Sequence, residues 1–275
     1  MELFDILEQV REKAPLVQCI TNFVTVNDCA NILLAAGASP TMAQDIREVE
    51  EAVACANGLV CNLGALDFVD SMILAGKRAN ALGIPVVLDP VAAGGTAIRR
   101  ELSAKLMEEV RFTAIRGNAS EIRALAGEGS LGSGVDAAAW DAITAENLPQ
   151  SVEIIRSLAQ KTGAVIAVSG AMDVVTDGDT TVLLHNGCAT MARITGSGCM
   201  LTTLIGGFCA AAPEYPLEAV CAAMAAMGIC GELAEERRLQ NGTGNATFRT
   251  DLIDAVFNLT ETQMKERTRY EIYEG

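Results

Sequence analysis

The sequence predicts a single α/β domain with a mostly parallel central sheet. Short apolar runs rich in β-branched residues alternate with longer helical patterns, which is typical of βαβ units and of a sheet covered by helices on both faces. No linker, low-complexity tract or repeat interrupts this alternation, so residues 1–275 are assigned to one domain. The apolar runs end in polar or glycine residues, which predicts a binding site beyond the carboxyl ends of the strands.

The individual elements follow from the same pattern. The runs expected to form parallel strands are 16–21, 58–64, 84–90, 112–118 and 163–170. The helices expected before the last of these strands cover 25–37, 44–56, 67–82, 97–110, 118–127 and 149–162. Beyond residue 198 the pattern is helical to about residue 237 and again over 246–260.

Two segments depart from the alternation. Residues 171–187 contain two strand-like runs around an Asp-Gly-Asp turn, which predicts a β-hairpin at the edge of the sheet. The sole histidine, His185, falls in this hairpin and is interpreted as an ordinary strand residue. The glycine-rich stretch 126–139 is the one loop that we expect to be long enough to be mobile.

The charge balance excludes one class of partner. The chain carries 35 acidic and 20 basic residues and has a formal charge of -15. A basic face that binds the phosphate backbone of nucleic acid is therefore not expected. A nucleotide can still bind where a metal ion and backbone N–H groups supply positive charge locally.

The nine cysteines bear on the cellular compartment. Their number is odd and none form a C-x-x-C motif, which argues against a disulfide framework or a zinc site and favours a reducing compartment. The N-terminal segment 1–15 is interpreted as an amphipathic helix without the apolar core of a signal peptide. The longest apolar stretches are interrupted and are interpreted as too short to span a bilayer. We therefore expect a soluble cytoplasmic protein with no membrane partner.

The motif "TGSGC", residues 195–199, carries the first candidate site. Gly196, Ser197 and Gly198 form a turn that leads into an apolar helix, so backbone N–H groups and the helix dipole would meet at an anion. Cys199 on the first helical turn is expected to have a pKa below the ordinary value of about 8.5 and to act as a weak base. The alternative is a buried helix whose cysteine serves as a small hydrophobic residue.

A second motif, "RGNASE" at 116–121, follows an expected strand. Asn118 and Glu121 have the spacing of an N-terminal capping box. The functional interpretation is that they hold a hydrated Mg²⁺ near nucleotide phosphates together with Asp89, because Mg²⁺ favours one or two carboxylates with waters and phosphate oxygens. Arg116 suits a two-bond contact with phosphate, or is an exposed loop arginine.

Five segments between about residues 15 and 250 occur in the same order as the sequence motifs of a known family. They read "QCITNFVTVNDCANILLAAGASPTMAQ", "VVLDPVAAGGT", "IRGNASEI", "VSGAMDVVTDG" and "ITGSGCM". Together they resemble the motifs of the hydroxyethylthiazole kinases, the thiamine-salvage branch of the ribokinase-like kinases. The resemblance implies a three-layer αβα sandwich, ATP as phosphoryl donor, Mg²⁺ as cofactor, and phosphorylation of 4-methyl-5-(2-hydroxyethyl)thiazole on its primary hydroxyl.

The resemblance also implies roles for single residues. Met42 is expected to contact the thiazole, Arg116 and Ser169 to contact ATP, and Gly196 to close the substrate site. Cys199 stands where many ribokinase-like relatives carry an aspartate base. Without the motif, Met42 would be interpreted as a core residue.

The family is known as a trimer with sites at subunit interfaces. This implies a homotrimer in which Asn22 and Met42 face a neighbour's Cys199. The partners expected from the resemblance are therefore ATP, the thiazole alcohol and further copies of the chain.

Three other functions fit parts of the sequence. A cysteine-nucleophile hydrolase or acyltransferase needs a base beside Cys199, usually histidine, and only His185 is available. A kinase of the same fold could act on another small alcohol, such as a hydroxymethylpyrimidine. An ATP-binding sensor would keep the fold and lose catalysis, which the intact Asp89, Glu121 and glycine turn disfavour.

Overall fold

The computed structural model describes residues 3–127 and 142–275, so most of the glycine-rich stretch 126–139 lies outside the described residues. In this part of the chain a nine-stranded sheet has the order β2-β1-β3-β4-β5-β6-β7-β8-β9. Neighbouring strands from β2 to β6 are parallel, and those from β6 to β9 are antiparallel. The strands are β1 (Leu16–Ile20), β2 (Ser39–Thr41), β3 (Gly58–Asn62), β4 (Val86–Asp89), β5 (Ala114–Asn118), β6 (Val165–Ser169), β7 (Asp173–Thr176), β8 (Thr181–Leu184) and β9 (Tyr270–Ile272).

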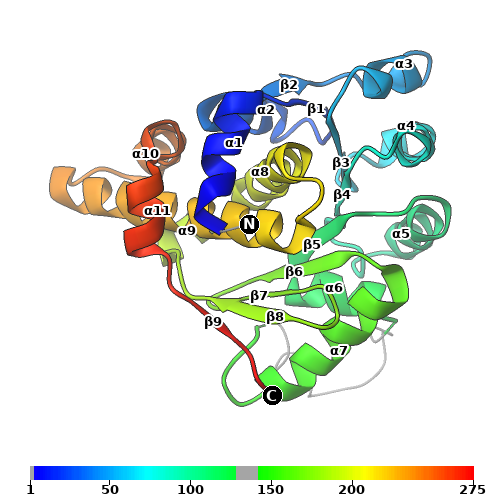
Figure 1. The fold of residues 1–275 in the computed structure, drawn as a ribbon. Coiled ribbons are helices and arrows are strands. Elements are labelled where there is room, and N and C mark those ends of the chain that lie inside the picture. Colours follow the sequence, from blue (N-terminus) through cyan, green and yellow to red (C-terminus); the bar gives the residue numbers. More distant parts are fainter. Residues whose placement is uncertain (1–2, 128–141) are drawn as a thin grey trace.

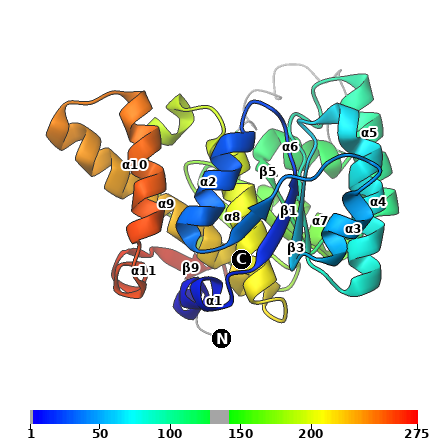
Figure 2. The ribbon, with the colours of Figure 1, turned by 90° about the horizontal axis from the view of Figure 1, so that it is seen from above.

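Helices cover both faces of the sheet (Figure 1). A cluster of buried apolar side chains fills the space between the sheet and each helical layer. One layer consists of α1 (Ile6–Lys13), α2 (Val26–Ala36), α8 (Ser197–Ala211), α9 (Pro216–Asn241), α10 (Asn245–Asn258) and α11 (Glu261–Arg267). The other consists of α3 (Val49–Ala54), α4 (Val69–Leu82), α5 (Ala97–Glu109), α6 (Ala119–Leu125) and α7 (Leu148–Thr162). Figure 2 shows the two layers on opposite sides of the strands. The predicted αβα sandwich is confirmed.

Helix α8 lies close against the sheet because small residues line the contact. A Cβ on Gly206 of α8 would collide with the Val60 side chain of β3. A Cβ on Gly58, at the start of β3, would lie 3.0 Å from the Cβ of Ala210. The C-terminal half of α8 thus packs on the beginning of β3, and the helix N-terminus lies at the carboxyl ends of the parallel strands.

Two expectations about single elements are wrong in detail, and two further features were not expected. The hairpin forms as β7 and β8, but β9 pairs with β8 and takes the edge of the sheet. The helical stretch expected from residue 198 to about 237 is present and divides into α8 and α9, because Pro213 and Pro216 cannot continue the α-helical hydrogen-bond ladder from α8. The helix expected over 44–56 covers only Val49–Ala54, and the short strand β2 was not expected.

Helix α9 is longer than the sequence interpretation allowed. Its 26 residues, with a mean hydropathy of 1.6 over the most apolar window, are long and apolar enough to cross a membrane by length and composition. However, 78% of that window is buried inside the protein, where α9 packs on α8, α10 and three strands. The high hydropathy therefore fits the central helix of a soluble protein.

Candidate active site

The turn before α8 has the geometry predicted for an anion cradle. Gly196 is the N-cap residue and has a left-handed backbone with φ of 85°. The hydrogen-bond ladder of α8 begins with Met200 N donating to Gly196 O at 2.8 Å. The amides of Ser197, Gly198 and Cys199 precede this bond, so they are free of the helical ladder and face the end of the helix. Three N–H donors and the positive end of the helix dipole thus point to one place at the end of α8, which is the arrangement that binds an anion.

Both glycines of the turn are required by their neighbours. A Cβ on Gly196 would lie 2.7 Å from Cγ2 of Thr25, which is the N-cap residue of α2. A Cβ on Gly198 would lie 2.5 Å from Nη1 of Arg116. The guanidinium of Arg116 therefore packs directly against the cradle, where it adds a positive charge.

A buried polar network joins Cys199 to three strand ends. Asn62 at the end of β3 donates to Asp89 Oδ2 at 2.9 Å and to Cys199 Sγ at 3.2 Å. Asn22, which follows β1, donates to Asn62 Oδ1 at 3.1 Å and lies 3.5 Å from the same sulfur. Thr202, one helical turn after Cys199, donates to Asp89 Oδ2 at 3.1 Å. The network holds the thiol at a fixed place beside the cradle.

The pKa expected for Cys199 is wrong in direction. Burial, and after it the carboxylate of Asp89, raises the pKa of the Cys199 thiol to about 11. Loss of water around the sulfur outweighs the favourable helix dipole, because desolvation penalises the thiolate. Cys199 is therefore a neutral thiol at neutral pH.

The capping box expected for Asn118 and Glu121 is present. Asn118 Oδ1 accepts from Glu121 N, and Glu121 Oε2 accepts from Asn118 N, both at 2.9 Å. Glu121 Oε1 accepts from Ala92 N at 2.8 Å, which ties the loop after β4 to the start of α6. Both carboxylate oxygens of Glu121 are thus engaged with backbone amides.

Asp89 is the buried carboxylate of this region. Burial raises the pKa of Asp89 to about 6; Arg116 opposes this shift and the nearby Glu121 adds to it. A second carboxylate near Asp89 disfavours the charge of Asp89, and a cation near both would relieve this. Within residues 3–127 and 142–275, no group of three or more His, Cys, Asp or Glu side chains is placed to hold a metal ion. The donor set fits Mg²⁺, which keeps waters and phosphate oxygens as ligands, and does not fit a complete protein cage.

A cavity of about 530 Å³ opens on one side of the cradle. Ser197 and Gly198 line it, together with Arg116 of β5 and Ser169 at the end of β6. Arg116 donates to Ser169 Oγ, so the structure joins the two residues predicted to contact ATP. Asp173 also lines this cavity; burial raises its pKa to about 6, and it accepts from Gly170 N at 2.8 Å.

A second cavity, of about 350 Å³, opens on the other side, next to Asn22. Its described lining includes Thr21, Phe23 and Gln44, but not Met42. Met42 instead packs against the buried cluster under the α8 and α9 layer. One chain therefore brings Asn22 to Cys199, whereas its partly buried Met42 lies against the core cluster. The contact of Met42 with the thiazole stays a prediction.

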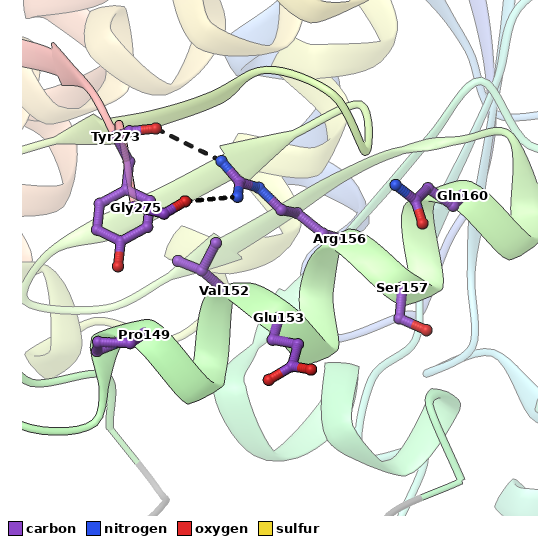
Figure 3. A pocket seen from close by; sticks show the side chains of 8 residues that line it. All are labelled: Pro149, Val152, Glu153, Arg156, Ser157, Gln160, Tyr273 and Gly275. Atoms are coloured by element: carbon purple, nitrogen blue, oxygen red, sulfur yellow. Dashed lines mark hydrogen bonds between the residues drawn. The ribbon is translucent and has the colours of Figure 1, made fainter.

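A third cavity, of about 490 Å³, lies away from these residues, between α7 and the C-terminal segment (Figure 3). Arg156 spans it, donating to the backbone carbonyls of Tyr273 at 3.4 Å and Gly275 at 3.1 Å. It contains none of the predicted site residues. The arginine here fastens the C-terminal segment to α7.

Asn62 is one of the polar strand ends from which the sequence predicted the binding site, and the structure adds its place in the network beside the strand that ends in Asp89. Sequence reasoning missed three other residues of the site. Thr202 completes the network, Thr25 lies against the turn, and Asp173 lines the cavity. Thr202 carried a weak signal, since it lies three residues after Cys199 on the same face of an apolar helix.

Comparisons with known proteins find relatives along nearly the whole chain. The hydroxyethylthiazole kinase family model matches residues 7–262. A hydroxyethylthiazole kinase of Clostridium acetobutylicum is 47% identical over 97% of this chain and 98% of its own length. The solved structure of the hydroxyethylthiazole kinase protein from Pyrococcus horikoshii OT3 is 34% identical, has a TM-score of 0.86 and covers 99% of both chains.

A more distant structure bears on the fold alone. A ribokinase-like superfamily protein from Enterococcus faecalis V583 is 13% identical, has a TM-score of 0.61, and the match covers 96% of this chain and 94% of that chain. The architecture is thus ribokinase-like. With the family model matched over most of the chain and close relatives aligned along its whole length, the chain belongs to the hydroxyethylthiazole kinase family.

Proposed function

We propose that this chain transfers the γ-phosphoryl group of ATP to the primary hydroxyl of 4-methyl-5-(2-hydroxyethyl)thiazole. Family membership assigns the reaction class, a phosphorylation in thiamine salvage. The observation that carries the proposal is the position of the α8 N-terminus between two cavities. One holds Arg116 and Ser169, and the other holds Asn22. A donor and an acceptor bound in these cavities would meet at the cradle.

The cradle supplies what phosphoryl transfer needs from a protein. The transferred group is held by charge-neutralising donors while attacking and leaving oxygens stay in line. The amides of Gly198 and Cys199 are such donors, and Arg116 packs against them. Arg116 Nε is buried and has no hydrogen-bond partner among the described residues, so a phosphate oxygen of ATP would satisfy a donor that is otherwise unpaired.

Cys199 is proposed as the catalytic residue that contacts the attacking hydroxyl. Its thiol is neutral in the free protein, so it orients the hydroxyl rather than removing its proton before transfer. Phosphoryl transfer through a loose transition state tolerates this, because little negative charge develops on the attacking oxygen early in the reaction. The hydroxyl proton then leaves late, as the new O–P bond forms and the bond to the leaving oxygen of ADP breaks, and it passes to an oxygen of the transferred phosphoryl group rather than to the sulfur.

Mg²⁺ is proposed at the strand ends, with Asp89 as its carboxylate and Glu121 acting through water. When bound, the ion neutralises charge on the phosphates of ATP. Asn118 lies at the same edge, where it caps α6 and would face the nucleotide.

The enzyme is further proposed to be a cytoplasmic homotrimer with sites at subunit interfaces. Next to Asn22, Phe23 is 91% exposed and Val24 is 55% exposed, which is unusual for apolar side chains beside a cavity. A neighbouring chain that covers them would also bring its own Met42 within reach of the thiazole. All nine cysteines are free, which fits a reducing cytoplasm.

A coupled assay for ADP release tests the proposed function. The protein is given ATP and Mg²⁺ with the thiazole alcohol or with a hydroxymethylpyrimidine. We expect turnover with the thiazole alcohol at a kcat/KM at least a hundredfold above that with the pyrimidine. Preference for the pyrimidine would assign the related kinase activity, and release with neither alcohol would leave an ATP-binding protein without this activity.

A further inference from the structure

A buried carboxylate lies directly behind the phosphate cradle. Asp28, on the first turn of α2, has a side chain that is only 5% exposed. Its Oδ2 lies 4.0 Å from the position that a Cβ on Gly196 would occupy. A negative charge at this place repels an anion held by the same turn, more strongly because little water lies between them. A chain with a formal charge of -15 has no excess of cations to offset it.

Arg249 of α10 neutralises this carboxylate. Its Nε donates to Asp28 Oδ2 at 2.8 Å, and its Nη2 donates to Oδ1. A guanidinium that binds both carboxylate oxygens fixes the orientation of the pair as well as its charge. The pair joins α10 to α2, two helices that pack side by side.

The same two helices also hold the backbone of the turn. Thr25, one turn before Asp28 at the start of α2, contacts the Gly196 backbone on one side. Asn245, one turn before Arg249 on α10, donates from Nδ2 to the carbonyl oxygen of Arg193 at 3.1 Å, three residues before Gly196. Movement of α10 against α2 would therefore shift the cradle.

We infer that Asp28 and Arg249 form a positioning pair for the phosphate cradle: Arg249 cancels the charge of Asp28 and locks α2 to α10 around Gly196. Neither residue is assigned contact with substrate; both act through the turn. The inference rests on the proposed function, because it takes the triphosphate of ATP as the anion. The larger effect of Arg249 is electrostatic, because it cancels the charge of Asp28. The smaller effect is geometric, because it holds α10 against α2.

The test uses charge rescue. Arg249→Met leaves the Asp28 charge uncompensated, and Asp28→Asn with Arg249→Met removes both charges. Arg267→Met is the matched control, because Arg267 joins α11 to Glu236 of α9 at 2.9 Å and is 36% exposed, against 42% for Arg249. Calorimetry gives the Kd for ATP with Mg²⁺, steady-state kinetics give KM and kcat, and thermal melts report folding.

The expected result is a loss of ATP affinity of about tenfold in Arg249→Met, recovery to within about threefold of wild type in the double variant, and no change in Arg267→Met. The effect should fall on the KM for ATP more than on the KM for the alcohol. Arg249→Lys, which keeps the charge, should lose less than threefold. Arg249→Gln, which also removes the charge, replaces Arg249→Met in both the single and the double variant if Arg249→Met does not fold.

Two results would overturn the inference alone. One is equal loss of ATP affinity in the single and double variants, which would assign only a structural role; the other is an unchanged affinity in Arg249→Met. Wild-type protein that neither binds ATP nor phosphorylates the thiazole alcohol would instead remove the proposed function, and the inference with it.

Discussion

At the scale of the residue, Cys199 shows how environment decides chemistry. The sequence places it at a helix N-terminus, where a thiol ordinarily becomes more acidic. The structure surrounds it with Asn22, Asn62 and Asp89, and burial raises its pKa to about 11. Local sequence predicts the dipole, but only the packed strand ends determine how much water reaches the sulfur. The sequence alone therefore predicts the position of Cys199 correctly and the direction of its pKa shift wrongly.

Substitutions at Cys199 test its contact with the attacking hydroxyl. Cys199→Ala should lower kcat about a hundredfold, and Cys199→Asp should keep more activity, because a carboxylate accepts the hydroxyl proton and a methyl group cannot. Single-turnover rates at saturating ATP and alcohol give the comparison. Cys209→Ala, a buried thiol on the same helix, is the control and should leave kcat unchanged. The opposite order of the two Cys199 variants would leave the residue a packing role only.

Asp89 provides a prediction about pH and stability. Its pKa is about 6 in the folded protein, above its ordinary value of 3.8, so the folded state binds the proton more tightly than the unfolded state. The free energy of unfolding should therefore fall as pH rises from about 4 to 6. Asp89→Asn removes this ionisation and still accepts hydrogen bonds from Asn62 and Thr202. Asp173, whose pKa is also raised to about 6, is present in both the wild type and Asp89→Asn. Its contribution to the pH dependence of stability therefore cancels when the two are compared.

Urea unfolding at pH 4.5 and 7.5 measures the effect. Asp89→Asn should gain about 2 kcal/mol of stability relative to wild type between the two pH values. A difference between the proteins that does not depend on pH would contradict the raised pKa of Asp89.

At the scale of the element, most of the fold could be predicted from periodicity and most boundaries could not. The parallel strands β1 and β3 to β6 are mostly buried on both faces and read as continuous apolar runs, which is why these five were expected, whereas the short, partly exposed β2 was not. Strand β9 is exposed and charged, and it exists because it pairs with β8 more than 80 residues earlier in the chain. Pairing of this kind leaves no local pattern.

The start of α6 shows that a cap and a functional site can be the same residues. Spacing alone predicted the capping box at Asn118 and left its second role open. The structure adds that Glu121 also binds Ala92 of the loop after β4, a contact between elements that spacing cannot reveal. The cap is thus tied to the edge of the sheet where the nucleotide is proposed to bind.

A pair of cap variants separates stability from function. Asn118→Ala and Thr260→Ala each remove a capping-box side chain, at α6 beside the site and at α11 away from it. Both should lower the free energy of unfolding by about 1 kcal/mol. Only Asn118→Ala should also raise the KM for ATP, by about tenfold, because it frees Glu121 from its place near the phosphates. Equal kinetics in the two variants would remove Asn118 and Glu121 from nucleotide binding.

At the scale of the whole molecule, the cavity beside Asn22 bears on the proposed trimer with sites at subunit interfaces. Sequence resemblance implied that Met42 contacts the thiazole, yet within one chain the partly buried Met42 packs against the core cluster and does not line that cavity. The exposed Phe23 and Val24 mark the surface that a second copy would cover. Residues that a neighbouring chain would contribute to the site depend on surfaces that meet only after folding. The sequence alone therefore could not predict which residues form the interface.

Phe23→Glu tests this assembly. A charge in a buried apolar contact should dissociate the trimer to monomers in sedimentation velocity and reduce activity at least tenfold, with an unchanged circular dichroism spectrum. Ile272→Glu is the control, since Ile272 is 60% exposed on β9 at the opposite edge of the sheet. A Phe23→Glu variant that stays trimeric and active would place the interface elsewhere.

The most direct measurement is a crystal structure of the protein with Mg²⁺, a non-hydrolysable ATP analogue and the thiazole alcohol. The account predicts that the γ-phosphate accepts hydrogen bonds from the amides of Gly198 and Cys199, at about 3 Å, with the hydroxyl of the alcohol beside the Cys199 sulfur. A triphosphate directed away from residues 196–199 would contradict it.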